Sequence, residues 1–205
     1  MPTAGSPYAG GRRQTDAMDL HDLHHAQSAV SVLLARLGPD DWGRPTPCDG
    51  WDVGAVVRHL SAGERAFTTS LGGVAYDLPT IAAELAAVPL ADLPATYDAG
   101  AALLRDALAS AGAGPFPTGI GPMPASAVAE LRTIEALTHG WDVARSVGAP
   151  YEVDAPVAER AIGHSLALME RLPPDRTPFG PPQPAADDAA AIDRLAALLG
   201  RALSA

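Results

Sequence analysis

Apolar residues recur at alternating steps of three and four along much of the chain, which is the spacing of one face of an α-helix. The first such stripe has one polar interruption, at Gln27, and stops at Gly38-Pro39; its members are Leu20, Leu23, Gln27, Val30, Leu34 and Leu37. A second stripe follows Asp52, a residue type that caps helix N-termini, and its members are Val53, Val56, Leu60, Gly63, Phe67 and Leu71. Both stripes predict amphipathic helices.

Similar patterns predict two more long helices, over residues 92–111 and 126–147, the second closed by Gly148 and Pro150. Shorter helices are expected at 80–87, 154–172 and 189–203, with Gly- and Pro-rich connections between elements. No segment reads as a confident strand, and no internal repeat is visible. The pattern therefore predicts an all-α protein, a four-helix bundle with long crossover loops and a short helical C-terminal extension.

Composition adds what the core is made of and which partners are excluded. Hydrophobic residues form 47% of the 205 residues but aromatic residues only 5%, so we expect a core of Ala, Leu and Val. The formal net charge is -10, and the 14 basic residues, all arginine, form no basic run. Because nucleic-acid binding needs a positive face, nucleic acid is not an expected partner.

The chain is expected to form one domain over residues 18–205, preceded by a disordered tail. Residues 1–17 are rich in Gly, Ser and Pro and carry no hydrophobic pattern. They also lack the apolar region of a signal peptide, and no stretch approaches the ~18–20 apolar residues of a membrane span. A single cysteine, Cys48, excludes an internal disulfide. We therefore expect a soluble cytoplasmic protein without membrane contact.

Polar residues on a core stripe are the candidates for chemistry. In the helix predicted over 126–147, Glu135 and His139 continue the stripe of Val128 and Leu131, one turn apart on the same face. A carboxylate in a core must be paired, protonated or bound to a cation. His59, at the edge of the stripe in the second helix, can face them as a third ligand. Two histidines and one carboxylate leave coordination positions open on a divalent metal, as catalytic sites do; zinc fits first, and nickel or iron are compatible.

A metal-free interpretation of the same residues is that Glu135 and His139 form a buried structural hydrogen bond. His59 is then a satisfied core histidine, and the protein is a helical structural or interaction module. Asp142, three residues after His139, either orients an imidazole, caps a loop or binds nothing.

The remaining candidates are interpreted as structural. Three histidines of the first helix are expected on a solvated face, and His164 is expected to pack in the fifth helix. Cys48 has no basic neighbour in sequence to lower its pKa and is expected to be inert. Tryptophans are expected to pack loops against helices. Arginines beside the candidate site are expected to pair with surface Asp residues, with contact of one of them to an anionic substrate as the alternative. These residues are His21, His24 and His25; Trp42, Trp51 and Trp141; and Arg58, Arg132 and Arg145.

Three motifs in this order resemble one family. They are W-x-R-P-T-P-C-x-G-W-x-V from Trp42 to Val53, the His59-Leu60 pair, and H-G-W-D-x-A-R-x-x-G from His139 to Gly148. The chain resembles the actinobacterial metal-binding proteins related to mycothiol-dependent maleylpyruvate isomerase, within the DinB/YfiT-like superfamily. The closing stretch F-G-P-P-Q-P with D-R-L-A-A-L-L-G-R is also similar to that group, so the resemblance extends over residues 19–203.

The resemblance implies a DinB-like four-helix bundle that holds a divalent metal on His59, Glu135 and His139. It also implies mycothiol as a cosubstrate, used either in cis-trans isomerisation or as a nucleophile in S-transfer to an electrophilic substrate. The isomerase itself carries a second, sheet-containing domain that helps to form its substrate site, whereas only a short helical stretch follows Gly148 here. The metal is therefore implied by the resemblance, and the substrate is not.

Two functional hypotheses follow from the resemblance. The first is a metal-dependent enzyme of low-molecular-weight thiol chemistry, in which the metal activates a thiolate. The alternative is a non-catalytic metal- or ligand-binding bundle, which would have a closed or apolar cavity around His59. Long apolar helix faces are compatible with a homodimer, and no sequence feature decides this.

Overall fold

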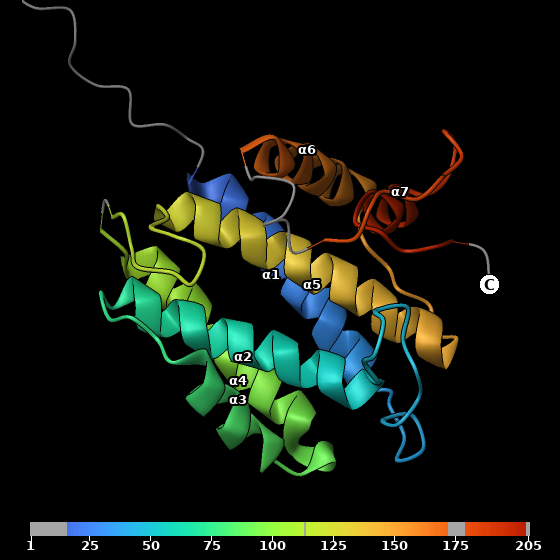
Figure 1. Ribbon diagram of the computed structural model, residues 1–205, viewed down its shortest axis with the longest axis horizontal. Coiled ribbons are helices and arrows are strands. Elements are labelled where there is room, and N and C mark those ends of the chain that lie inside the picture. Colours follow the sequence, from blue (N-terminus) through green and yellow to red (C-terminus); the bar gives the residue numbers. More distant parts are fainter. Residues whose placement is uncertain (1–15, 113, 172–178, 204–205) are drawn as a thin grey trace, which may run out of the picture.

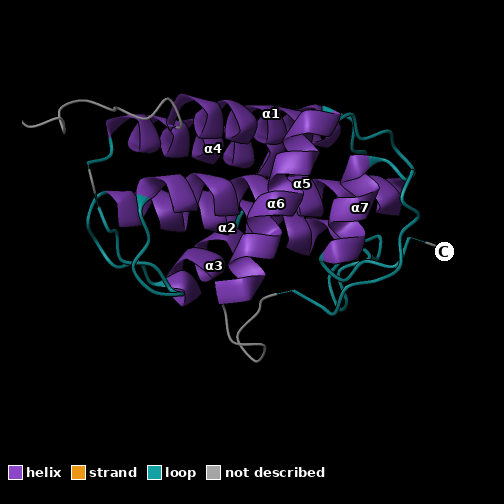
Figure 2. Ribbon diagram, turned by 90° about the horizontal axis from the view of Figure 1, so that it is seen from above, coloured by secondary structure: helices purple, strands orange, loops and turns teal. Residues whose placement is uncertain are grey.

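The computed structural model describes residues 16–112, 114–171 and 179–203, and within these ranges it is built of helices (Figures 1 and 2). They are α1 (Asp16–Leu34), α2 (Val53–Leu71), α3 (Leu78–Ala86), the short 3-10 helix η1 (Leu90–Asp92), α4 (Leu93–Ser110), α5 (Ala125–Val147), α6 (Ala155–Arg171) and α7 (Ala191–Leu198). The described part of the chain contains no strand. This confirms the predicted all-α fold.

Four of these helices form the bundle. Helix α1 packs along α5 and α4, and α2 packs against α4 and α5. Between them lies a core made largely of Leu, Val and Ala, as the low aromatic content predicts. Helix α3 covers the outer side of α2, whereas α6 and α7 lie on the opposite side of the bundle, beside α5 (Figure 1).

Local signals explain where the helices begin and end. The side chain of Asp52 accepts a hydrogen bond from the backbone N–H of Ala55 at 2.7 Å, so it caps α2 as predicted. Helix α5 ends at Gly148, which adopts the left-handed conformation (φ 67°) that glycine reaches without strain. Helix α1 is shorter at its C-terminus than the stripe suggested, since Leu37 lies beyond it. It begins at Asp16, within the tail predicted over residues 1–17; residues 1–15 lie outside the described ranges.

The polar interruption of the first stripe, Gln27, is buried and bonded. Its side-chain N–H donates to Oε1 of Glu64 at 3.1 Å, and its amide oxygen accepts from Nη1 of Arg105 at 2.6 Å. A buried amide without such partners would be costly. Gln27 therefore belongs to a polar network between α1, α2 and α4.

The C-terminal extension is attached to α5 by both apolar and polar contacts. Leu195, Ala196 and Ala197 of α7 are buried, and Nε1–H of Trp141 on α5 donates to Oδ1 of Asp193 on α7 at 2.7 Å. Trp141 thus packs one helix against another, rather than a loop against a helix as the sequence suggested. Helix α6 crosses in front of α5 (Figure 2) and packs against α7.

No described helix is by itself long and apolar enough to cross a membrane. The segments Leu78–Ala86 and Leu90–Ser110 satisfy the length and composition criteria only as a pair, bent by 113°.

We expect Asp22→Asn to lower the free energy of unfolding at pH 7 by about 1–3 kcal/mol, because Asp22 joins α1 to α6. The carboxylate is 4% exposed and accepts two hydrogen bonds from Arg160, at 2.5 and 2.6 Å. Burial by itself would raise the pKa of Asp22, but the hydrogen bonds and positive charge of Arg160, together with those of His21, outweigh it and lower that pKa. The contribution to stability is therefore complete above an ordinary carboxyl pKa of about 3.9 and is lost as the pH falls through the lower folded value.

Urea unfolding at pH 7 and at pH 3 measures this contribution, with the exposed Asp40→Asn as control. The difference between wild type and Asp22→Asn should shrink at the lower pH. An equal difference in the free energy of unfolding between wild type and Asp22→Asn at both pH values would contradict a lowered pKa of Asp22.

Candidate functional site

The three predicted ligand side chains meet between two helices of the bundle. His59 projects from α2, and Glu135 and His139 project from α5, one turn apart. Oε2 of Glu135 lies 2.9 Å from Nε2 of His59 and 3.5 Å from Nε2 of His139. One ligand atom from each residue lies within 4.8 Å of the other two. His59 and Glu135 lie 76 residues apart in the sequence, and the packing of α2 on α5 brings them together.

The spacing of these atoms suits a metal ion. A tetrahedral zinc ion with bonds of about 2.0–2.1 Å holds its ligand atoms about 3.3 Å apart. The distances from Oε2 of Glu135 to the two imidazole nitrogens, 2.9 and 3.5 Å, bracket that value. The donor set of two imidazoles and one carboxylate also suits nickel or iron. The three side chains therefore fit a divalent ion and would occupy three of its coordination positions.

Asp142 orients the imidazole of His139. Its Oδ2 lies 3.0 Å from Nδ1 of His139, so Nδ1–H donates to this carboxylate and Nε2 points toward Glu135. Of the three roles considered for Asp142, the structure supports the first. Asp142 is itself fully buried and accepts hydrogen bonds from Nε and Nη2 of Arg201, at 3.2 and 2.9 Å. Arg201 follows α7 and was not identified from the sequence, since no local pattern links it to a residue 59 positions earlier.

Electrostatics keep the carboxylate of Glu135 ionised. Burial by itself would raise its pKa, but hydrogen bonds to His139 and His59 outweigh this and hold the pKa well below its usual range. For His139, burial would lower the pKa, whereas its bonds to Asp142 and Glu135 raise it above the ordinary value. A metal ion must therefore displace a proton shared among these residues, so metal affinity should fall as the pH falls.

Arg132 is not the surface residue that the sequence suggested. It is 2% exposed, and its Nη2 donates to the carbonyl of Leu60 at 3.2 Å and to Oε1 of Glu64 at 3.4 Å. Its Nη1 lies 3.9 Å from Oε2 of Glu135. Gly63 makes room for this side chain, since a Cβ there would lie 2.3 Å from Nη1. The guanidinium thus lies between the carboxylates of Glu64 and Glu135.

The other two arginines beside the site also differ from the expectation of pairing with surface Asp residues. Nη1 of Arg58 donates to the carbonyls of Leu85 and Val88 and so ties α2 to the end of α3. Nη2 of Arg145 donates to the carbonyl of Leu203, and its guanidinium lies over the ring of Trp141. Neither reaches the candidate site.

The three ligand residues line a cavity of about 450 Å³. Its walls come from the loop before α2, from α2 and α5, and from the segments on both sides of α7; the lining residues are Pro47, Cys48, Asp49, Trp51, His59, Glu135, Thr138, His139, Phe179, Gly180, Leu199, Gly200 and Arg201. Gly200, with φ 95°, lets the chain approach Gly180 closely, since a Cβ would lie 2.7 Å from Gly180 Cα. Residues of the three motifs and of the closing stretch therefore meet at one cavity.

Trp51 and Cys48 lie closer to the ligands than the sequence suggested. The ring centroid of Trp51 is 4.8 Å from that of His59 and 5.9 Å from that of His139, so it contacts the ligands themselves. Cys48, with His139 and Asp142, forms a second group whose ligand atoms lie within 4.8 Å of one another. Burial raises the pKa of the Cys48 thiol despite the nearby Arg201, which agrees with the expected inert thiol.

The remaining histidines lie elsewhere. His21 and His24 are exposed on α1, as expected for a solvated face. Nε2 of the half-buried His25 accepts a hydrogen bond from the backbone N–H of Asp154 at 3.1 Å. His164 is half-buried on α6, beside Asp22 and Glu130.

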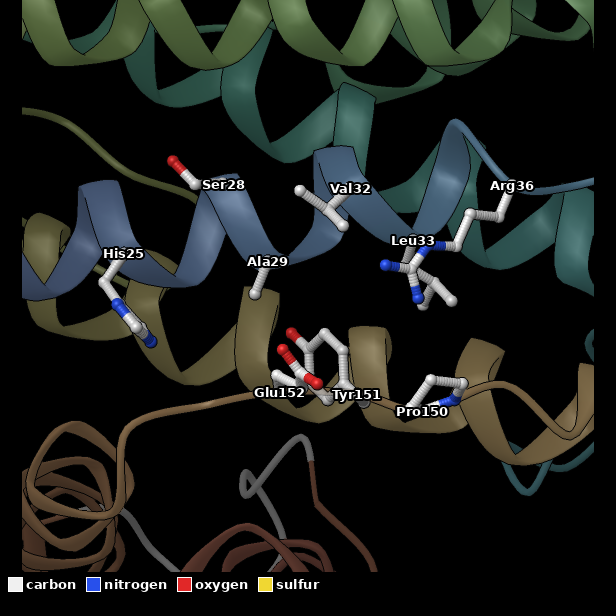
Figure 3. A pocket seen from close by; sticks show the side chains of 9 residues that line it. All are labelled: His25, Ser28, Ala29, Val32, Leu33, Arg36, Pro150, Tyr151 and Glu152. Carbon is white, nitrogen blue, oxygen red and sulfur yellow. The ribbon is translucent and has the colours of Figure 1, made fainter.

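A second cavity, of about 180 Å³, lies between α1 and the segment that follows α5 (Figure 3). Its walls are His25, Ser28, Ala29, Val32, Leu33 and Arg36 of α1, and Pro150, Tyr151 and Glu152. The hydroxyl of Tyr151 donates to the carbonyl of Ala136, so it is engaged. Neither group of potential metal ligands among the described residues lies in this cavity. The larger cavity is therefore the better candidate site.

Comparisons with known proteins identify the family of this chain. Residues 23–144 match the family model described as the mycothiol maleylpyruvate isomerase N-terminal domain. An uncharacterized protein of Mycobacterium tuberculosis is 29% identical over 86% of this chain and 93% of its own length. Another uncharacterized protein of that organism is 31% identical over 77% of this chain and 69% of its own.

A solved structure shares the fold. The crystal structure of the mycothiol-dependent maleylpyruvate isomerase superposes with a TM-score of 0.61 and 16% sequence identity, over 72% of this chain and 67% of that one. A mutant of that enzyme superposes with a TM-score of 0.56. The matched family model covers α2 and most of α1 and α5, and so includes all three candidate ligands.

Proposed function

The chain belongs to the family of the mycothiol maleylpyruvate isomerase N-terminal domain, and on that premise we propose that it is a metal-dependent enzyme of low-molecular-weight thiol chemistry. In this proposal His59, Glu135 and His139 hold a divalent ion, with zinc as first choice, and mycothiol is the cosubstrate. The reaction is either S-transfer to an electrophile or an isomerisation. The observation that carries the proposal is the convergence of the three ligand atoms beside a cavity of about 450 Å³.

The residues around the ligands support this role. A bound divalent ion would supply an open coordination position at which a thiol loses its proton more readily. Asp142 holds the proton on Nδ1 of His139 and so leaves Nε2 available to the ion. The indole of Trp51 lies against both imidazoles and restricts their orientation. The side chain of His59 remains 39% exposed, so a ligand can reach the site from solvent.

The non-catalytic alternative is less well supported. A bundle of that kind is expected to have a closed or apolar cavity around His59. Here the cavity wall includes charged and polar side chains, among them Asp49, Thr138 and Arg201. The substrate of the solved isomerase is not assigned to this chain, which covers 67% of that enzyme's length.

Thiol binding to cobalt-loaded protein tests the proposal. We expect mycothiol to bind at about one molecule per chain, to produce a sulfur-to-cobalt charge-transfer absorption and to release about one proton, because the thiolate is the metal-binding form. The S-methylated thiol is the matched control and should produce no such band. Cobalt binding without any change on addition of mycothiol would contradict thiol chemistry and favour the non-catalytic alternative.

A further inference from the structure

Thr138 has a hydroxyl group that is buried and unpaired. The residue is 2% exposed, and its Oγ1 has no hydrogen-bond partner among the described residues. An unsatisfied buried hydroxyl is costly compared with one that is bonded. Native proteins keep few such groups, and each calls for an explanation, such as a catalytic role or a bound water or ion.

The other buried serine and threonine side chains of the described helices behave differently. The hydroxyl groups of Ser61, Thr133 and Ser165 each donate to the backbone carbonyl four residues earlier. Ser70 donates to the carbonyl of Pro117. A threonine in a helix has a rotamer that makes the same bond. The hydroxyl of Thr138 is therefore the exception among the five.

The position of Thr138 places this hydroxyl beside the candidate metal ligands. Thr138 follows Glu135 by three residues, so it shares the face of Glu135 on α5, and it directly precedes His139 in the sequence. It also lines the same cavity of about 450 Å³, together with Cys48 and Trp51. A molecule that fills this cavity would thus lie against both the ligands and Thr138, whose hydroxyl can turn toward it by rotation about the Cα–Cβ bond.

We propose that the hydroxyl of Thr138 donates a hydrogen bond to an oxygen atom of the thiol cosubstrate and so positions it at the metal. This inference rests on the proposed function. Because the sulfur of the thiol is used by the metal, the acceptor at Thr138 is an oxygen elsewhere in the molecule. Such a bond gives the buried hydroxyl the partner that the protein does not supply.

The test compares Thr138→Val, which removes the hydroxyl at nearly constant volume, with Thr138→Ser, which keeps it. Thr133→Val is the control, because Thr133 is a buried threonine on the same helix whose hydroxyl bonds to Ala129. Each protein is loaded with cobalt, its cobalt affinity is measured, and mycothiol is titrated by absorption. Ethanethiol, which has no oxygen, is the second probe.

We expect Thr138→Val to bind mycothiol about tenfold more weakly, the loss of one hydrogen bond. Thr138→Ser and Thr133→Val should bind it as wild type does, and ethanethiol should bind all four proteins equally, with cobalt affinity unchanged. If Thr138→Val does not fold, Thr138→Ala replaces it with the same expectation.

Several results would overturn the inference. They are wild-type mycothiol affinity in Thr138→Val, equal losses for mycothiol and ethanethiol, or a loss of cobalt affinity that places the hydroxyl in support of the metal ligands. Failure of wild-type protein to bind either thiol would instead overturn the proposed function, and this inference with it.

Discussion

Alanine in place of His139 is expected to reduce bound metal from about one ion per chain to near zero. His139 is one of three ligands, and its imidazole is the one oriented by a buried carboxylate, Asp142. Its loss leaves two donors, His59 and Glu135, which cannot hold a divalent ion with comparable affinity. Elemental analysis of untagged protein, purified without added metal or chelator, measures the content directly and identifies the metal.

The matched control is His24→Ala, since His24 lies exposed on α1 away from the cavity. This variant should retain the metal content of the wild type. Metal retained by His139→Ala would refute the ligand set. A wild-type protein that takes up no metal, even after incubation with zinc or nickel, would favour the interpretation of Glu135 and His139 as a structural pair.

Removing the buried guanidinium of Arg132 is expected to produce the largest loss of stability. We expect Arg132→Met to lower the free energy of unfolding of the metal-free protein by about 3–5 kcal/mol, because it leaves a charge buried without a partner. Glu64 is fully buried, and Nη2 of Arg132 lies 3.4 Å from its Oε1 as the cationic partner. Urea unfolding followed by circular dichroism measures the change.

The double variant Arg132→Met with Glu64→Gln separates the charge from the packing. Methionine fills much of the space left by arginine, and glutamine removes the unpaired charge. We therefore expect the double variant to be more stable than Arg132→Met alone. Equal stability of the single and double variants would show that lost packing, and not a buried charge, causes the destabilisation.

Much of the fold follows from local sequence signals. The spacing of apolar residues predicts each main helix to within a few residues, because one face of a helix must be apolar to be buried. Asp52 and Gly148 mark helix ends because their side chain or backbone satisfies groups that the helix leaves unpaired. Gln27 is where the pattern is broken, and the tertiary structure supplies the reason in its bonds to Glu64 and Arg105.

The candidate ligands could also be identified from the sequence, because Glu135 and His139 occupy inward positions at helical spacing and His59 lies at the edge of a facing stripe. Their convergence depends only on two helices packing together. The surroundings of the ligands could not be identified in this way. Arg201 reaches Asp142 from beyond α7, and Trp51 reaches His59 from a loop.

The sequence by itself therefore determined the helices and the side chains that face the core, since periodicity is a local property of the chain. Only the tertiary structure decided which of these side chains meet, which are paired and which are left unpaired. Arg132 and Thr138 illustrate this. Arg132 is buried and hydrogen-bonded to Glu64, whereas the hydroxyl of Thr138 is buried without a partner among the described residues. Both outcomes depend on contacts between segments distant in sequence, which no local pattern encodes.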